Sequence, residues 1–263
     1  MSLDLTDEQR LIRDTSRYFS RAELAPIGAN CNRERQWISL SANLQKLAAL
    51  GFLGVNIEEK YGGAAAGKIA FGLAITEISQ VCPITAAMVT VINLVCEVIQ
   101  DLGTDKQKKE YLFQICSGKL SIGIHLPINI CTRSSATDMD MTIMKGLDHY
   151  VINGSVSLTV SKPFVGVYAF LVPADEIVEP HRKCTNCFLI EANMQGLNFD
   201  SQSQEPDLNI PATKKISFDN CQVPASQITS RHSDALRNIL LKVIGINDCN
   251  SSLHMGVILN HTS

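Results

Sequence analysis

The stretch SIGIHLPINICTRSSATD, residues Ser121–Asp138, marks a change of pattern in this chain. Before it, apolar residues recur at helical spacing, as in residues 40–48. After it, short runs alternate between apolar and polar residues, which is typical of half-buried strands. The sequence therefore predicts an all-α helical domain over 1–120, a β-domain over 121–230, and a junction at which a ligand could bind.

Two capping boxes predict where helices begin in the first domain. Thr6 is followed by Gln9, and Thr104 by Gln107, at the spacing that lets each pair satisfy two backbone N–H groups. A further helix is expected from about Ser39 to Gly51.

The section 69–102 is rich in apolar residues, and Pro83 is expected to divide it into two buried helices. We therefore expect no apolar run long enough to span a membrane, which takes roughly 18 residues.

The second domain reads as several short strands. HYVINGSVSLTV, residues 149–160, is expected to form two strands around a turn at Asn153-Gly154. Residues 165–174 and 183–192 are apolar runs of strand length. The run after Lys214 alternates until a turn is expected at Asp219-Asn220. The fold class predicted is α+β, with the helical domain followed by an antiparallel β-barrel or sandwich. Helical spacing returns after Ser233, which predicts that 231–263 is a stub of a truncated C-terminal helical domain.

Composition and charge exclude several classes of protein. The apolar fraction is 45% and the net charge is −3, so nothing recommends nucleic acid as a partner. The first ten residues are polar and acidic, unlike a signal or transit peptide, and we expect a cytoplasmic protein with no membrane association.

The nine cysteines are scattered, which favours reduced thiols that act as small apolar residues. Only HRKCTNC, with His181, Cys184 and Cys187, suggests a metal site, and no second pair of ligands follows it. No metal site is therefore predicted.

Five segments in this order resemble the acyl-CoA dehydrogenases: LTDEQRLIRDTSRYF, LAALGFLGVNIEEKYGG, LGTDKQKKEYLFQICSGK, YVINGS and ISFDNCQVP. Together they extend over most of residues 3–225. The resemblance implies a flavoprotein in which FAD lies against the β-domain. It also implies an acyl-CoA or acyl-carrier thioester as substrate, and a homo- or hetero-oligomer with a related subunit.

The resemblance also implies which residues contact the cofactor. The family's loop out of the helical domain carries a Thr-Glu-Pro triplet, and here that slot falls near Ile128-Asn129-Ile130. The cofactor contacts are placed at Leu126, Ser134 and Thr159. Thr159 also suits an ordinary strand position, because β-branched residues are common in sheets.

No catalytic residue is nominated. Family members carry the base in the C-terminal domain, and here IGINDCNSSLHMG offers only Asp248 as a carboxylate, outside the matching slot. Three hypotheses remain open. The chain is an FAD-dependent dehydrogenase that needs a partner, a non-catalytic assembly or regulatory subunit, or a fragment of a normal enzyme. The altered loop favours the second for the chain taken alone.

Overall fold

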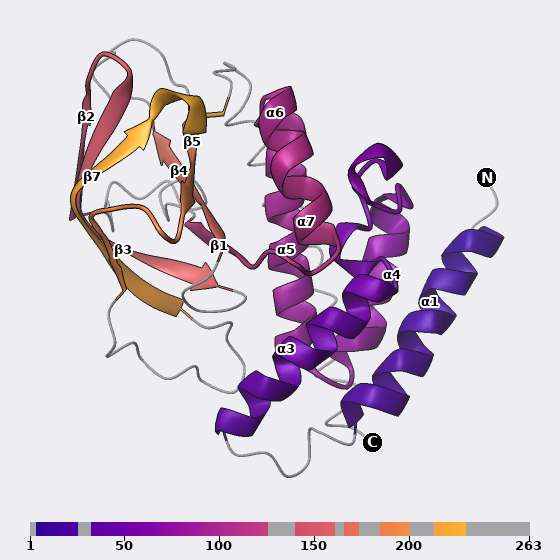
Figure 1. The fold of residues 1–263 in the computed structure, drawn as a ribbon. Coiled ribbons are helices and arrows are strands. Elements are labelled where there is room, and N and C mark those ends of the chain that lie inside the picture. The colour runs from indigo at the N-terminus through magenta and orange to yellow at the C-terminus, as the bar shows by residue number, and fades with distance from the viewer. Residues whose placement is uncertain are drawn as a thin grey trace.

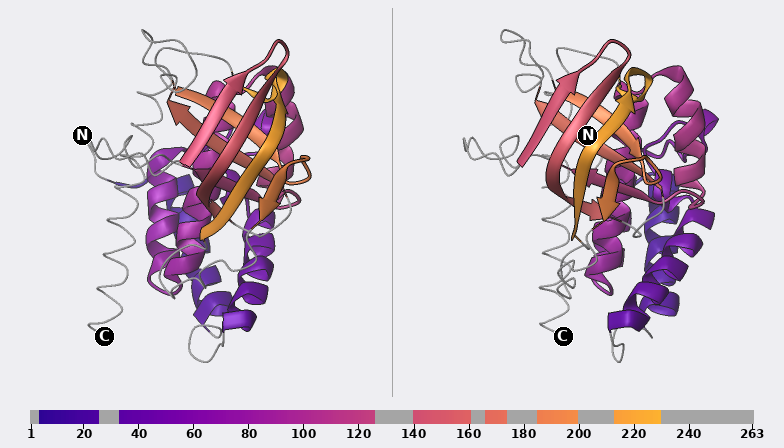
Figure 2. Two further views of the ribbon diagram at one scale, coloured as in Figure 1. Left: turned by 90° about the vertical axis from the view of Figure 1, so that its left-hand side faces the viewer. Right: turned by 60° about the vertical axis from the view of Figure 1, so that its left-hand side comes forward.

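The helices and the strands of the protein form two layers that lie side by side (Figure 1). Two further views show the curved sheet on one side of the helices (Figure 2). The structure is a computed structural model, and it describes residues 4–25, 33–125, 140–160, 166–173, 185–199 and 213–229. The α+β class is confirmed. The expected stub over 231–263 lies outside the described residues.

Both capping boxes are present. Thr6 Oγ1 accepts a hydrogen bond from the N–H of Gln9 at 3.2 Å, and α1 (Asp7–Phe19) follows. This helix continues into a π-helical turn, η1 (Ser20–Leu24). The box at Thr104 caps α6 (Asp105–Gln107), which runs on through the π-helical turn η4 (Lys108–Leu112) into α7 (Phe113–Cys116).

The second helix begins earlier than predicted. α3 extends over Arg33–Ala49, so the expected start at Ser39 is wrong by six residues. The residues before Ser39 are mostly polar and give no apolar period, yet Arg, Glu and Gln are good helix formers. The stop is as predicted, because Gly51 takes a left-handed φ of +80° after the helix.

Pro83 separates two helices as predicted, α4 (Gly67–Ser79) and α5 (Pro83–Leu102). The expectation about membrane-length segments is wrong. α5 is long and apolar enough to cross a membrane by length and composition alone, with a mean hydropathy of 1.6 over 18 residues. Its apolar character is accounted for by burial, since 67% of that window lies inside the protein.

A polar ladder on α5 holds the loop that follows α3. That loop contains two 3₁₀ turns, η2 (Phe52–Gly54) and η3 (Glu59–Tyr61). Asn93, which is 1% exposed, accepts a hydrogen bond from the N–H of Val55 and donates to the carbonyl of Phe52, both at 2.9 Å. One and two turns further along, the ladder adds Asn56 Nδ2 to Glu97 at 2.7 Å and the Glu58 N–H to Gln100 at 2.9 Å.

In the part of the chain that the structure describes, seven strands form one sheet in the order β5-β4-β1-β3-β7-β6, with β2 paired to β3. Their bounds are β1 Ile122–His125, β2 Asp140–Lys145, β3 His149–Val160, β4 Val167–Pro173, β5 Thr185–Glu191, β6 Leu197–Phe199 and β7 Thr213–Pro224. The pairs are antiparallel except β1–β4, which is parallel. After β7, a 3₁₀ turn (Ala225–Gln227) leads to a bridge between Ile228 and Phe188 of β5, which curls the sheet toward a barrel.

The predicted turn at Asn153-Gly154 is wrong. β3 is one strand of 12 residues, and its register against β7 shifts between Ile152 and Gly154. The side chain of Asn153 accepts a hydrogen bond from the N–H of Asn220 at 2.7 Å. Asn220 itself has a φ of +47° but does not end β7, so the turn expected there is also wrong. Asn153-Gly154 and Asp219-Asn220 therefore lie opposite each other at an irregularity in the ladder between β3 and β7. The two strands pair on both sides of this irregularity.

The two faces of the sheet belong to different cores. Ile122, Ile124, Val167 and Ala169 pack into the same buried cluster as the helices. Tyr168 and Phe170, which alternate with them along β4, lie in a second cluster with the aromatic residues of β5 and β7. Alternate side chains of β1 and β4 therefore face the helices, and through these two strands the sheet packs against the helical layer.

Candidate functional site

β1 positions the predicted cofactor segment, because Leu126 follows its last residue. In the antiparallel pairing of β1 with β3, Ile124 lies opposite Thr159. Thr159 is thus brought to the strand that ends immediately before Leu126, and on its other side it lies opposite Thr213 of β7. Of the three predicted cofactor residues, the structure therefore places Thr159, on the strand that pairs with β1.

The remaining predicted site residues cannot be placed in the same way. Leu126 and Ser134 lie outside the described residues, as do Asp248 and the His181 and Cys184 of HRKCTNC. The last residue of that motif, Cys187, is fully buried in β5, and burial raises the pKa of its thiol to about 12. Within the ranges that the structure describes, no group of three or more His, Cys, Asp or Glu side chains could hold a metal ion.

Gly166 allows β4 to begin directly against the domain junction. Its φ is +132°, and a Cβ at this position would collide with the carbonyl oxygen of Ser121. The next N–H, that of Val167, donates to the same Ser121 oxygen at 3.1 Å. A residue with a side chain would therefore be strained and would push β4 away from the start of β1.

His125 is a residue near the site that the sequence reasoning missed. It ends β1, is 5% exposed, and lies in register with Phe170 of the parallel strand β4. The two rings are tilted with centroids 6.3 Å apart. The available signal was a histidine placed between apolar residues in the segment IGIHL, where a strand buried on both faces would bury the imidazole. An imidazole is thus buried one residue before Leu126.

A second polar contact ties the helices to the sheet. The Tyr111 hydroxyl lies 3.0 Å from Glu191 Oε1 at the end of β5 and 3.3 Å from the side-chain oxygen of Gln227. Burial raises the pKa of Tyr111 to about 12. Nearby, Gln107 Nε2 donates to the carbonyl oxygen of Ser226 at 3.0 Å. These contacts fix how the two layers meet. No sequence pattern predicts them, because the partners lie 80 or more positions apart.

Comparison with known proteins agrees with this architecture. The family description "Acyl-CoA dehydrogenase, N-terminal domain" matches residues 6–119, which include the described helices. The short-chain specific acyl-CoA dehydrogenase of Clostridium acetobutylicum is 25% identical over 232 residues, 88% of this chain. An acyl-CoA dehydrogenase of Bacillus subtilis is 26% identical over 250 residues, 93% of this chain. Residues 6–119 therefore match the N-terminal domain of the acyl-CoA dehydrogenase family, and the relatives extend that similarity over most of the chain.

Solved structures share the fold. Butyryl-CoA dehydrogenase from Megasphaera elsdenii superposes with a TM-score of 0.80 at 20% identity, covering 99% of this chain and 68% of that chain. A structure described as PigA with FAD and proline gives 0.80 at 19% identity, covering 99% and 67%. The chain spans 60% of the length of the clostridial relative and 64% of the Bacillus one.

Proposed function

We propose that this chain is the FAD-binding part of an acyl-CoA dehydrogenase-like protein that acts on acyl thioesters, and that it is catalytically impaired as a lone chain. The observation that supports the site is the register that sets Thr159 beside β1, whose end leads into Leu126. We also propose a division into units near residues 120 and 230, where the sequence period changes, and a cytoplasmic location, from the polar and acidic first ten residues.

The donor chemistry of these residues fits a flavin edge. The hydroxyl groups of Thr159 and Ser134 and the backbone N–H of Leu126 are donors that could hold the ring's polar atoms. When bound, the flavin would accept the hydride that leaves the β-carbon of the thioester. The residues of this chain would bind and orient the ring and keep water from its protein-facing side.

Weak binding is expected, because Ile128-Asn129-Ile130 replaces most of the hydrogen-bonding triplet. Two branched apolar side chains offer no donor or acceptor to a polar ring edge. Removal of the α-proton also needs a positioned base. By resemblance, the base lies in the family's C-terminal domain, and no residue of this chain is nominated for that role.

The test is flavin binding by the purified chain. FAD at 100 times its dissociation constant should raise the unfolding free energy by about 2.7 kcal/mol. Thr159→Val should weaken FAD binding about fivefold through the loss of one hydrogen bond. Thr142→Val, the same change at an exposed position in β2, is the matched control and should leave binding unchanged.

The altered loop favours one alternative, a non-catalytic assembly or regulatory subunit that binds a full-length homologue. A colourless chain whose melting temperature does not respond to FAD would exclude the flavoprotein proposal. Co-expression with a full-length family member then decides between the remaining roles. Co-purification in a fixed ratio supports the subunit, whereas no association leaves a fragment without a partner.

A further inference from the structure

Among the described residues, no other element covers two large apolar side chains on the outer face of α1. Leu11 is 67% exposed and Tyr18 is 76% exposed. They are seven residues apart, so they lie on the same face of the helix, about 10 Å from each other along its axis. The opposite face is buried, with Ser16 and Phe19 inside. α1 thus has an apolar stripe toward solvent as well as one toward the core.

Charge is distributed unevenly along this helix. The first turn is acidic, with Asp7 and Glu8, while Arg17 lies in the last turn and Arg21 follows in η1. Next to the exposed stripe is a shallow groove of about 560 Å³, which we call the arginine groove; it is lined by Arg13, Asp14, Arg17, Tyr18, Arg21 and Ala22. One end of the helix is therefore negative and the other end positive.

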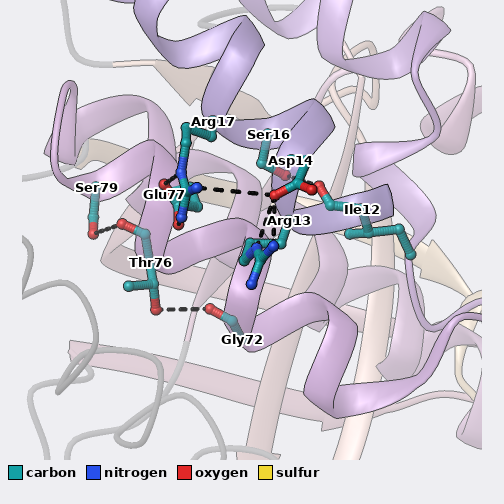
Figure 3. Close-up of polar contacts among 9 residues, drawn as sticks. All are labelled: Ile12, Arg13, Asp14, Ser16, Arg17, Gly72, Thr76, Glu77 and Ser79. Atoms are coloured by element: carbon teal, nitrogen blue, oxygen red, sulfur yellow. Dashed lines mark hydrogen bonds and ion pairs between the residues drawn. The ribbon is translucent and has the colours of Figure 1, made fainter. Parts of the chain in front are cut away.

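Contacts within the chain hold the walls of the arginine groove in place (Figure 3). Arg17 donates from Nε and Nη2 to both carboxylate oxygens of Glu77 on α4, at 3.0 and 2.7 Å. The Glu77 carboxylate, which is 10% exposed, raises the pKa of Arg17. Asp14 lies 2.8 Å from Arg13, whose hydrogen bond lowers the pKa of Asp14. The charges of the groove are thus oriented before any ligand arrives.

We propose that the outer face of α1 binds the same face of a second copy of this chain, with the two helices antiparallel. In that arrangement, centred on Asp14, the negative end of each helix lies against the positive end of the other. Asp7 of one copy then faces Arg21 of the second copy, and the reverse holds for the other pair. Leu11 of each copy meets the region of Tyr18 of the other. A two-fold axis repeats the contact between Asp7 and Arg21, so the charged ends of both copies are paired.

Charge complementarity favours a second copy over a small anion. In the groove, the carboxylate of Asp14 already occupies the space beside Arg13, which leaves little net positive charge for a free phosphate. The α1 helix of a second copy instead supplies an acidic first turn opposite Arg21 and apolar side chains opposite Leu11 and Tyr18. The surface area that one helix face buries is smaller than the roughly 800 Å² that each partner buries in a stable complex. The dimer is therefore weak and sensitive to salt.

Sedimentation velocity over a concentration series tests the pairing with charge-reversed variants of the full chain. Asp7→Lys and Arg21→Glu each turn two attractive pairs of the dimer into repulsive ones, and each should raise the dissociation constant about tenfold. An equimolar mixture of the two variants restores both attractive pairs in the heterodimer. It should therefore associate about as tightly as the wild type. Glu8→Lys makes the same charge change one position away, on another side of the helix, and should have a smaller effect.

Two results would overturn the proposal. One is a wild-type chain that stays monomeric at every concentration in low salt. The other is a mixture of Asp7→Lys and Arg21→Glu that associates no more tightly than either variant alone. Circular dichroism melts of both variants check folding. Because the mixture contains the same two polypeptides, its recovery cannot come from a change in folding. Association through any other surface would not show this reciprocal rescue.

Discussion

Replacing Asn93 by alanine removes the residue that connects α5 to the loop after α3. The side chain hydrogen-bonds to the N–H of Val55 and the carbonyl of Phe52, each at 2.9 Å. Both loop residues are at most 3% exposed, so water cannot take the place of the amide without a rearrangement. An unsatisfied buried donor or acceptor costs about 1–3 kcal/mol, so the two together should lower the unfolding free energy by roughly 2–5 kcal/mol.

Urea denaturation followed by far-ultraviolet circular dichroism measures this change. Gln100→Ala is the matched control on the same helix, because it removes one hydrogen bond to the exposed N–H of Glu58. Its cost should stay below about 1 kcal/mol, since water can replace that bond. The reasoning fails if Asn93→Ala unfolds within 1 kcal/mol of the wild type at an unchanged denaturant slope, or if the two variants lose equal stability.

The remaining predictions concern the junction and α1. Because the folded-state pKa of Tyr111 is raised from about 10 to about 12, its stabilising effect is complete below pH 10 and is lost as pH rises through 12. A pH series of melts should therefore show about 2 kcal/mol more alkaline loss for the wild type than for Tyr111→Phe. Gly166→Ala should lower the melting temperature by several degrees, because the methyl group meets Ser121; an unchanged melting curve would contradict the close approach. Arg17→Lys keeps the charge but loses the bidentate hydrogen bonds to Glu77, which should weaken the packing of α1 against α4. Faster amide hydrogen exchange in α1 would measure this change.

Local chemistry was readable from the sequence wherever it depends on a few adjacent residues. Both capping boxes and the break at Pro83 belong to this class, since their hydrogen bonds and steric effects act within one turn. The start of α3 was not readable, because its first residues show no apolar period and form a helix through propensity alone.

The sheet could be predicted only in outline. Asn153-Gly154 has the composition of a hairpin turn, but β7 pairs with β3 on both sides of it, and the pair became an irregularity instead. Which strands are neighbours depends on contacts far apart in the chain, as for the parallel pair β1–β4. The position of Thr159 beside β1 follows from that pairing. The residue itself could be nominated from sequence, but its neighbours could not.

The central position of β1 has a consequence for how the chain is made. β1 follows directly on α7, and its apolar side chains complete the helical core, so it can dock there as soon as the helices have been synthesised. Its sheet partners, β3 and β4, leave the ribosome only later, up to Pro173. During that interval β1 has both backbone edges open, which is the arrangement most prone to pairing with another nascent chain. Expression conditions that slow elongation after Ser121 should therefore increase aggregation.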